Sequence, residues 1–417
     1  MNEHSQHRNF DTLGIDPGIL QILHDRRFTT PTPIQQQSIP AGIQGKDIVG
    51  IAQTGTGKTF AFGIPMLQRL ANGPGRGLVV LPTRELAYQV EESLKIFASA
   101  LNIRTAVIVG GASMNLQKDM IRRNPRIVIA TPGRLNDHLM QRTITLKEVS
   151  ILVLDEADRM LDMGFRPQIE QILEHVPKDR QTMLFSATMP HEIMQLANEQ
   201  MKLPLRIEVA PAGTAAELVQ QELFIVQKAE KMQLLEHLLQ EHEGTVLVFS
   251  RTKYGAKKIT ANLRRSGHTA AEIHANRSLA QRREALEGFK SGKYRVLVAT
   301  DIAARGIDVA GIAVVVNYDL PDDANDYVHR IGRTARAGRE GIAISFATPD
   351  QSGGIRTIEK LIRSQLKRKS LPSHLPPPPP LPAIQQDTSH RRGKDTSAPA
   401  HGARRNRRGF SGPRRRR

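Results

Sequence analysis

The sequence contains no cysteine and no tryptophan, and only 4% of its residues are aromatic. Without cysteine, the chain can form no disulfide, no thiolate nucleophile and no cysteine-ligated zinc site. No apolar run approaches the roughly 18 residues that a membrane-spanning helix needs, and the opening segment MNEHSQHRNF lacks the apolar stretch of a signal peptide. We therefore expect a soluble, cytoplasmic protein with no membrane partner.

The positive charge of the chain is unevenly distributed. Of the formal net charge of +18, the segment from Lys367 to Arg417 carries +12, because fourteen Lys and Arg stand there against two Asp. A net positive charge favours a polyanionic partner. A polyproline run followed by Arg, Gly, Ser and Pro cannot bury enough apolar surface to fold. The composition thus predicts a disordered Pro-rich and Arg-rich tail over residues 367–417.

Short aliphatic runs recur along the rest of the chain. Six of them lie between residues 47 and 188, and five more lie between 245 and 348. Such runs are typical of strands buried on both faces of a parallel sheet, and the amphipathic stretches between them are long enough for crossover helices. The pattern predicts an α/β protein with parallel-sheet domains at 1–210 and 218–366, joined by a linker at 211–217 that is rich in small residues.

A glycine-rich loop, AQTGTGKT, stands between the first predicted strand and a predicted helix. In this arrangement backbone N–H groups and a helix N-terminus face phosphates, while Lys58 can reach the β- and γ-oxygens and Thr59 can hold Mg²⁺. The usual motif opens with glycine where this chain has Ala52, and a plain glycine turn is the alternative interpretation. The candidate nucleotide-binding residues of the loop are Ala52, Gln53, Thr54, Gly55, Thr56, Gly57, Lys58 and Thr59.

Two acidic residues, Asp155 and Glu156, follow the aliphatic run ILVL. The first carboxylate after such a strand can bind Mg²⁺ through water, and the next can orient or deprotonate the attacking water. Adjacent acids at a strand end are usually only a solvated turn. The Lys58 loop about a hundred residues earlier favours the functional interpretation.

The glycine-rich loop and the DEAD acids together resemble the motifs of the DEAD-box RNA helicase family, over about the first 365 residues. The resemblance implies two tandem RecA-like parallel-sheet domains with an interdomain cleft. It also implies ATP and Mg²⁺ as cofactors, and single-stranded and short duplex RNA as the partner. Closing of the two domains on one strand would displace its complement, and ATP hydrolysis would reopen them.

The segment RFTTPTPIQ, residues 27–35, resembles the adenine-recognition motif of this family. The resemblance implies that Phe28 stacks on adenine and that Gln35 reads its edge, with Phe10 as the upstream aromatic. The family usually has glycine where this chain has Arg27.

Several further segments resemble the RNA-binding motifs of the family. Hydroxyls, Arg side chains and exposed N–H groups at strand ends suit phosphate and ribose contacts, although TPGR is also a common helix start and GG a common hinge. The implied RNA-binding residues are Pro82, Thr83, Arg84, Gly110, Gly111, Thr131, Pro132, Gly133, Arg134, Arg251, Asn276, Arg277 and Thr300. Near Asn276 and Arg277 the sequence departs from the family pattern at two positions. Ala275 replaces the usual glycine, and Leu279 replaces a glutamine.

The remaining motifs are implied to complete and couple the nucleotide site. YVHRIGRTARAGR resembles the last motif of the family, which implies Arg333 and Arg336 as γ-phosphate fingers, and Asp308 is implied to contact the ribose or a linking water. The implied catalytic residues are Lys58, Asp155, Glu156, Arg333 and Arg336, and the implied coupling residues are Asp158, Ser186, Ala187, Thr188 and His329.

Within the family, the short core with its basic extension looks most like the bacterial RhlE group. Roles in ribosome assembly, RNA turnover or cold adaptation remain open, as do protein partners and the oligomeric state. Three alternatives also remain: an RNA clamp without productive unwinding, a non-enzymatic RNA chaperone, and a DNA substrate.

Overall fold

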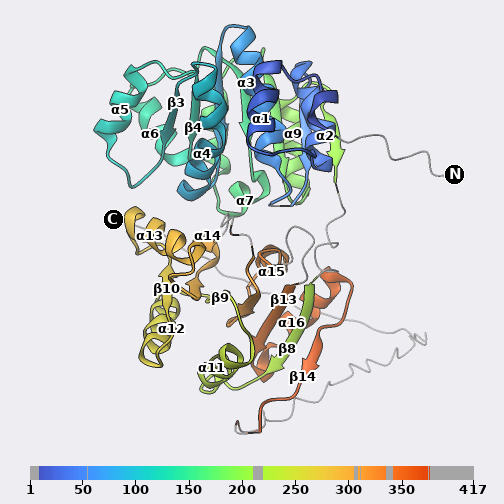
Figure 1. The fold of residues 1–417 in the computed structure, drawn as a ribbon, viewed down its shortest axis with the longest axis vertical. Helices are drawn as coiled ribbons and strands as arrows, with labels where there is room; N and C mark the ends of the chain where they lie inside the picture. Colours follow the sequence, from blue (N-terminus) through green and yellow to red (C-terminus); the bar gives the residue numbers. More distant parts are fainter. Residues whose placement is uncertain are drawn as a thin grey trace, which may run out of the picture. The chain divides into compact units, whose positions relative to one another are not determined.

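The computed structural model describes residues 9–53, 55–209, 219–304, 309, 311–334, 341–373 and 375. Within them the chain forms two parallel sheets of seven strands each, covered by helices (Figure 1). No helix in this described part is long and apolar enough to cross a bilayer. Three predicted site residues, Thr54, Asp308 and Arg336, and the predicted linker 211–217 lie outside the described residues.

The first sheet has the strand order β3-β4-β2-β5-β6-β1-β7. Aliphatic runs form its strands because both faces are covered by helices, which confirms the six runs predicted from the sequence. β1 lies between β6 and β7 and is parallel to both. The strands are β1 (Ile48–Ile51), β2 (Arg76–Val80), β3 (Thr105–Ile108), β4 (Ile127–Ala130), β5 (Val149–Leu154), β6 (Gln181–Ser186) and β7 (Leu205–Glu208).

The helices of the first domain divide between the two faces of this sheet. α1 to α4 pack on one face and α6 to α9 on the other, each through a continuous apolar core. These elements are the 3-10 helix η1 (Phe10–Thr12), α1 (Pro17–Asp25), α2 (Pro33–Ile43), α3 (Lys58–Asn72), α4 (Arg84–Ala100), α5 (Met114–Arg122), α6 (Pro132–Met140), α7 (Ala157–Asp162), α8 (Arg166–Glu174) and α9 (His191–Gln200).

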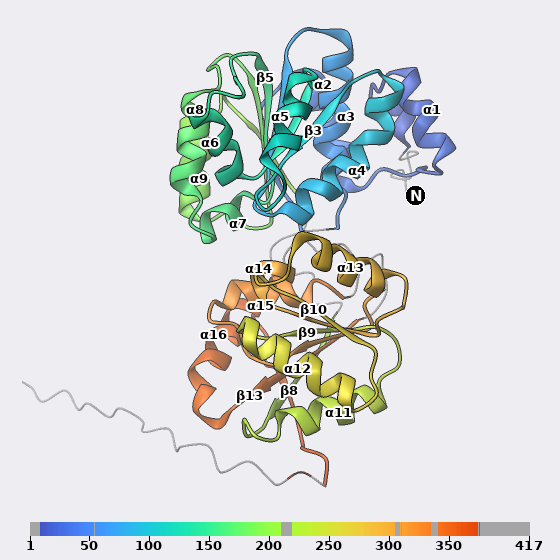
Figure 2. The same cartoon turned by 90° about the vertical axis from the view of Figure 1, so that its left-hand side faces the viewer.

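The second sheet has the order β10-β11-β9-β12-β13-β8-β14, and its five predicted runs are confirmed as strands. Its strands are β8 (Val219–Ile225), β9 (Val246–Phe249), β10 (Ala270–Ile273), β11 (Val296–Ala299), β12 (Val314–Asn317), β13 (Gly341–Ala347) and β14 (Lys367–Lys369). Its helices are α11 (Lys231–Glu241), α12 (Lys253–Arg265), α13 (Leu279–Lys290), α14 (Asp301–Ala304), α15 (Ala324–Ile331), η2 (Pro349–Gln351) and α16 (Ser352–Ile362). α11 and α12 cover the face that Figure 2 turns to the viewer, and α13, α15 and α16 pack on the other.

The second domain continues past residue 366, where we predicted that the tail begins. Lys367–Lys369 form β14, which pairs in parallel with β8, and Leu375 is buried in the core beneath α11 and α12. These residues therefore belong to the folded domain and not to a disordered tail. The sequence KRK gives no sign of this strand, because its three side chains are exposed at the edge of the sheet.

Candidate nucleotide-binding and RNA-binding site

The glycine-rich loop leaves the carboxyl end of β1 and runs directly into α3. Gly57 caps the helix with φ 90°, a backbone conformation that side chains disfavour. A Cβ atom at Gly57 would also overlap the amide of Gln35, whose Nε2 donates to the Gly57 carbonyl at 3.0 Å. Lys58 and Thr59 are then the first residues of α3, at its positive N-terminal end.

Two of the three predicted adenine-recognition residues, Gln35 and Phe28, contact this loop or the helix that follows it. Gln35 is buried, and its Oε1 accepts a hydrogen bond from the Thr32 N–H at 2.9 Å, which fixes the amide at the start of α2. Phe28 is 41% exposed and lies edge-on to Phe60 at 5.1 Å between ring centroids. Phe10, in contrast, is buried in the core of the first domain.

Lys58 forms a buried ion pair with Glu156 at the carboxyl edge of the first sheet. Lys58 Nζ lies 2.9 Å from Glu156 Oε1, and the two side chains are 5% and 3% exposed. Burial acts to raise the pKa of Glu156, but the positive charges of Lys58, Arg159 and Arg333 outweigh it and hold the pKa below its ordinary value. Burial likewise acts to lower the pKa of Lys58, but Glu156 and other acids raise it. Both groups are therefore ionised.

Asp155 differs from its neighbour, because burial raises the pKa of its carboxyl to about 7. Its Oδ1 accepts a hydrogen bond from the Glu156 N–H at 2.9 Å. Glu156 itself has φ 55° and stands at the N-cap of α7, an unusual conformation for a residue with a side chain. Such strain costs on the order of 1–3 kcal/mol and is commonly found at functional sites.

The third acid of the segment, Asp158, connects α7 to the end of β6. Its Oδ2 accepts hydrogen bonds from the backbone N–H of Ala187 at 3.2 Å and from both the N–H and the hydroxyl of Thr188 at 2.8 Å. Its own N–H donates to Ser186 Oγ at 3.2 Å. All four predicted coupling residues of the first domain are thus brought into one buried network.

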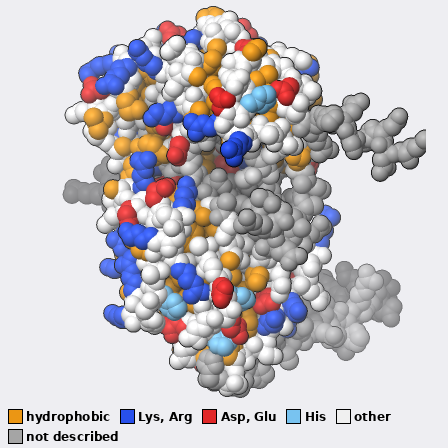
Figure 3. Space-filling model, in the orientation of Figure 1, with side chains coloured by type: hydrophobic (Ala, Val, Ile, Leu, Met, Phe, Trp, Pro, Cys, Tyr) orange, Lys and Arg blue, Asp and Glu red, His pale blue; other side chains and the backbone are white. Residues whose placement is uncertain are grey.

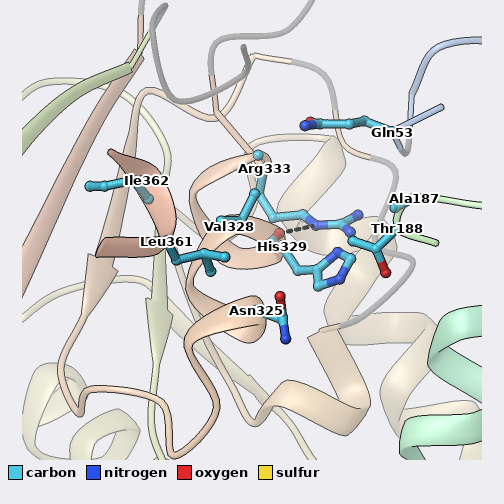
Figure 4. A pocket seen from close by; sticks show the side chains of 10 residues that line it. Gln53, Ala187, Thr188, Asn325, Val328, His329, Arg333, Leu361 and Ile362 are labelled. Carbon is cyan, nitrogen blue, oxygen red and sulfur yellow. Dashed lines mark hydrogen bonds between the residues drawn. The ribbon is translucent and has the colours of Figure 1, made fainter. Parts of the chain in front are cut away.

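His329 and Arg333 stand at the C-terminal end of α15 and just beyond it. Figure 4 shows both side chains in a pocket whose lining also includes Gln53 and Thr188. Arg333 is buried, and its Nε donates to the His329 carbonyl at 3.2 Å. Burial lowers the pKa of His329, although the negative charges of Asp158 and Glu156 oppose that change. Residues from both domains therefore act on the same group of acids.

In the first domain, the predicted RNA-binding residues follow three strands that are neighbours in the sheet, β3, β4 and β2. The Arg84 guanidinium lies so close to Gly111 that a Cβ atom there would overlap it. Arg134 Nη1 donates to the Ala112 carbonyl at 3.0 Å, so α6 is tied to the same glycine turn. Thr83 Oγ1 accepts the Leu86 N–H at 3.4 Å and caps α4. These contacts bring the three motifs together, with Pro82, Thr131 and Pro132 buried, Gly110 partly buried and Gly133 exposed.

In the second domain, the predicted RNA-binding residues follow β9, β10 and β11, which are also neighbours. Asn276 Oδ1 accepts a hydrogen bond from Lys253 Nζ at 3.1 Å. Arg277 contacts the buried carboxylate of Glu272. The Arg251 guanidinium donates to the Leu320 carbonyl at 3.3 Å. Thr300 stands at the end of β11, directly before α14.

Sequence reasoning missed the residues that hold the Arg251 loop in place. Asp319 Oδ2 accepts the Arg251 N–H at 3.1 Å, and Asp319 Oδ1 pairs with the buried Lys231 at 3.1 Å. Asp319 follows the aliphatic run VVVNY just as the recognised acids follow theirs, so its position after a strand was an available signal. The largely buried ion pair between Arg282 and Glu85, at 2.8 Å, was also not predicted.

The chain is similar to known proteins over most of its length. Residues 32–196 match the model of the DEAD/DEAH box helicase family, and residues 230–338 match the helicase conserved C-terminal domain. The ATP-dependent RNA helicase CshA of Listeria monocytogenes is 42% identical over 367 residues, covering 87% of this chain and 71% of that protein. The ATP-dependent rRNA helicase RRP3 of Debaryomyces hansenii is 41% identical over 370 residues, covering 88% and 78%.

Two similar solved structures contain RNA and a nucleotide analogue. Mss116p (NTE and C-tail double deletion) bound to ssRNA and AMP-PNP has a TM-score of 0.82 and 30% identity, covering 89% of this chain and 81% of that one. S. cerevisiae Dbp5 bound to RNA and ADP BeF3 has a TM-score of 0.77 and 30% identity, covering 87% and 95%.

Proposed function

Because the chain belongs to the DEAD-box family of ATP-dependent RNA helicases, we propose that Lys58, Glu156 and Arg333 form the core of its ATP-hydrolysing site. The enzyme uses ATP to close two RecA-like domains on single-stranded RNA and to unwind short duplexes locally. One observation carries the assignment of residues: the buried Lys58–Glu156 pair lies at a glycine-rich loop, and the charge of Arg333 acts on the same carboxylate.

Glu156 is the base that takes the proton of the attacking water. Its low pKa keeps it ionised, but the same Lys58 contact that lowers the pKa also occupies the carboxylate. The phosphates of ATP compete for Lys58, since a lysine in such a loop reaches the β- and γ-oxygens. Nucleotide binding would therefore free the Glu156 carboxylate for water.

The residues present fit Mg²⁺ bound mostly through water and phosphate oxygens. No cluster of three or more candidate ligands occurs in the described part of the chain, and Mg²⁺ at phosphate sites needs only one or two protein oxygens. Asp155 is buried with a raised pKa, so a nearby divalent cation would stabilise its ionised form. Asp155 and the Thr59 hydroxyl would hold the ion, which supplies positive charge against the phosphates.

Arg333 is an arginine finger that completes the site from the second domain. Such a finger increases the rate of ATP hydrolysis by a factor of about 10³ to 10⁵. Arg336 and Asp308 lie outside the described residues, and we propose that they contact the γ-phosphate and the ribose or a linking water, respectively. ATP and RNA each favour the closed state, so each should increase the affinity for the other.

RNA runs along the carboxyl edges of both sheets, over the turns that carry Arg84, Gly111, Arg251 and Asn276. Contacts from these groups to phosphate and ribose carry no sequence information. Membership of the RhlE group rests only on the short core and the basic extension. The relatives described above carry other names, CshA and RRP3. We also propose a cytoplasmic location, the compartment that the absence of cysteine favours.

The function is tested with the full chain in two assays. ATP turnover is measured with single-stranded RNA, duplex RNA and DNA, and strand displacement is measured on short RNA duplexes with and without ATP. We expect RNA-stimulated turnover and ATP-dependent displacement. RNA-stimulated turnover without displacement would identify a clamp, and annealing without turnover would identify a chaperone.

A further inference from the structure

An exposed tyrosine stands at the start of α12, beside the candidate RNA-binding residues of the second domain. Tyr254 is 71% exposed, and Phe28, of the adenine-recognition segment, is the other exposed aromatic side chain among the described residues. A single exposed aromatic ring is common on protein surfaces, so its surroundings decide whether it has a role. The backbone around Tyr254 is held by close contacts, and several positively charged side chains lie near it.

The backbone that presents Tyr254 is fixed from both sides. Thr252 caps α12, with its Oγ1 accepting the Gly255 N–H at 2.9 Å. A Cβ atom at Gly255 would lie 2.5 Å from Ser250 Oγ, so the first turn of the helix packs closely against the end of β9. Only a glycine fits there without movement. The tyrosine ring is thus held out from a rigid turn, which reduces the entropy lost when a ligand stacks on it.

Positive charge surrounds the ring. Lys253 Nζ lies 5.4 Å from the centroid of the Tyr254 ring and bonds Asn276 Oδ1 at 3.1 Å. Lys257 and Lys258 are exposed one turn further along the helix. Residues 253–265 contain five Lys and Arg and no acid. Figure 3 shows Lys and Arg gathered at the edge of the second domain where Figure 1 places α12 and α13.

We propose that Tyr254 is a stacking platform for one base of single-stranded RNA, with Lys257 and Lys258 contacting the phosphates that follow. This inference rests on the proposed function, because Arg251 and Asn276 hold the adjoining phosphates in it. Stacking on an aromatic ring tolerates every base, so the platform adds affinity without sequence preference. The base would lie on the face of the ring away from Lys253.

The test combines protein variants with RNA that lacks single bases. Affinity is measured by fluorescence anisotropy with AMP-PNP for the wild type, Tyr254→Ala, Tyr254→Phe and the control Leu203→Ala, which shortens a fully exposed side chain next to β7. The RNA is a 12-nucleotide strand with one abasic position, moved along the strand in a series.

We expect Tyr254→Ala to weaken binding about tenfold, the lower range for loss of one stacked base, with Tyr254→Phe and Leu203→Ala close to wild type. One abasic position should weaken the wild type by a similar factor and leave Tyr254→Ala unaffected, because the contact is already lost. Thermal midpoints and RNA-free ATPase should be unchanged in all variants.

Two results would overturn the platform: equal affinities of the wild type and Tyr254→Ala, or an abasic profile that is the same in both. Failure of the proposed function is a separate outcome. If the wild type shows no RNA-stimulated turnover, the proposed function is wrong. If the wild type is stimulated normally and Tyr254→Ala binds RNA as tightly as the wild type, only the platform is rejected.

Discussion

The backbone conformation of Glu156 places its side chain near three positive charges. Those of Lys58, Arg159 and Arg333 hold the pKa of its carboxyl below the ordinary value. Replacing Glu156 with Gln removes the proton acceptor and keeps the size of the side chain and the neighbouring Asp155. We expect turnover to fall by about 10² to 10⁴, the usual contribution of a positioned acid or base, while binding of ATP and RNA is retained. Steady-state ATPase and nucleotide-binding titrations measure the two properties separately.

The matched control for this prediction is Glu199→Gln, which makes the same change on the exposed side of α9. It should turn over at the wild-type rate. Near-native turnover of Glu156→Gln would show that another group activates the water.

Gln35 contacts both the start of α2 and the glycine-rich loop. Because its Nε2 donates to the Gly57 carbonyl, Gln35→Ala should weaken the binding of any nucleotide somewhat. We further expect it to reduce the preference for ATP over GTP, since an amide at the adenine edge is the discriminating group. The measurement is kcat/KM for both nucleotides, with the exposed Gln37→Ala on the same helix as the control.

Only the ratio of the two kcat/KM values tests the adenine role of Gln35. An equal loss for ATP and GTP would mean that Gln35 acts through the loop alone.

The Arg-rich segment 327–339 shows where single-residue prediction fails. Arg330 is buried, pairs with both oxygens of Asp301 at 2.5 and 2.7 Å, and lies over the ring of Phe249. It holds α15 to the sheet, whereas Arg333 lines the pocket. Composition cannot separate these two roles, because the partner of Arg330 is 29 residues away and is brought near only by folding.

At the scale of helices and strands, the sequence predicted the strands with short aliphatic runs, including the edge strands β3 and β10, but missed three other strands. Runs such as 151–154 and 246–249 are continuous and aliphatic because helices cover both faces. β7, β8 and β14 were missed, because each exposes part of its surface and carries polar or charged residues. Such strands are favoured by pairing with their neighbours, which hydrophobic periodicity does not record.

The RNA-binding turn of the first domain rests on a buried polar network between helices. His138 of α6 lies 3.2 Å from Gln117 Oε1 of α5 through its Nε2, and Gln117 Nε2 donates to the Val109 carbonyl at 2.9 Å, directly before Gly110. Nothing in the sequence relates these positions to the glycine pair. Two ordinary helices therefore fix the backbone that we propose contacts phosphate.

This network predicts a dependence of stability on pH. Burial, with Arg134 and Lys118 adding to it, lowers the pKa of His138 from its ordinary value of 6.5. The unfolded chain therefore binds the proton more readily, so the stabilising contribution is complete above pH 6.5 and is lost as the pH falls below it. Each unit of pKa shift corresponds to about 1.4 kcal/mol in the free energy of unfolding.

The measurement compares urea unfolding at pH 7.5 and 5.5 for the wild type, His138→Gln and His175→Gln. His175 is exposed directly after α8 and serves as the control. We expect His138→Gln to lose less stability between the two pH values than the other two proteins. Identical losses in all three would exclude His138 as the source.

At the scale of the whole molecule, half of the formal net charge of +18 lies beyond residue 380. Leu375 packs in the second domain, so a truncation after 380 leaves β14 and its neighbours intact. The removed segment contains eleven Lys and Arg and two Asp. A truncation at the predicted boundary of 366 would instead remove β14. The effect of the lost charge on RNA binding could then not be separated from a loss of domain stability.

We expect truncation after residue 380 to weaken RNA binding and to reduce its dependence on salt. Cations that neutralise phosphates release counterions, and for single strands the slope of log affinity against log salt is about −0.7 per phosphate neutralised. ATPase at saturating RNA should stay near that of the full chain, because the proposed nucleotide contacts all precede residue 337. RNA affinity at several salt concentrations is measured for both proteins, together with kcat at saturating RNA. Equal salt slopes would show that the segment does not contact RNA, and a collapse of kcat would show that it takes part in domain closure.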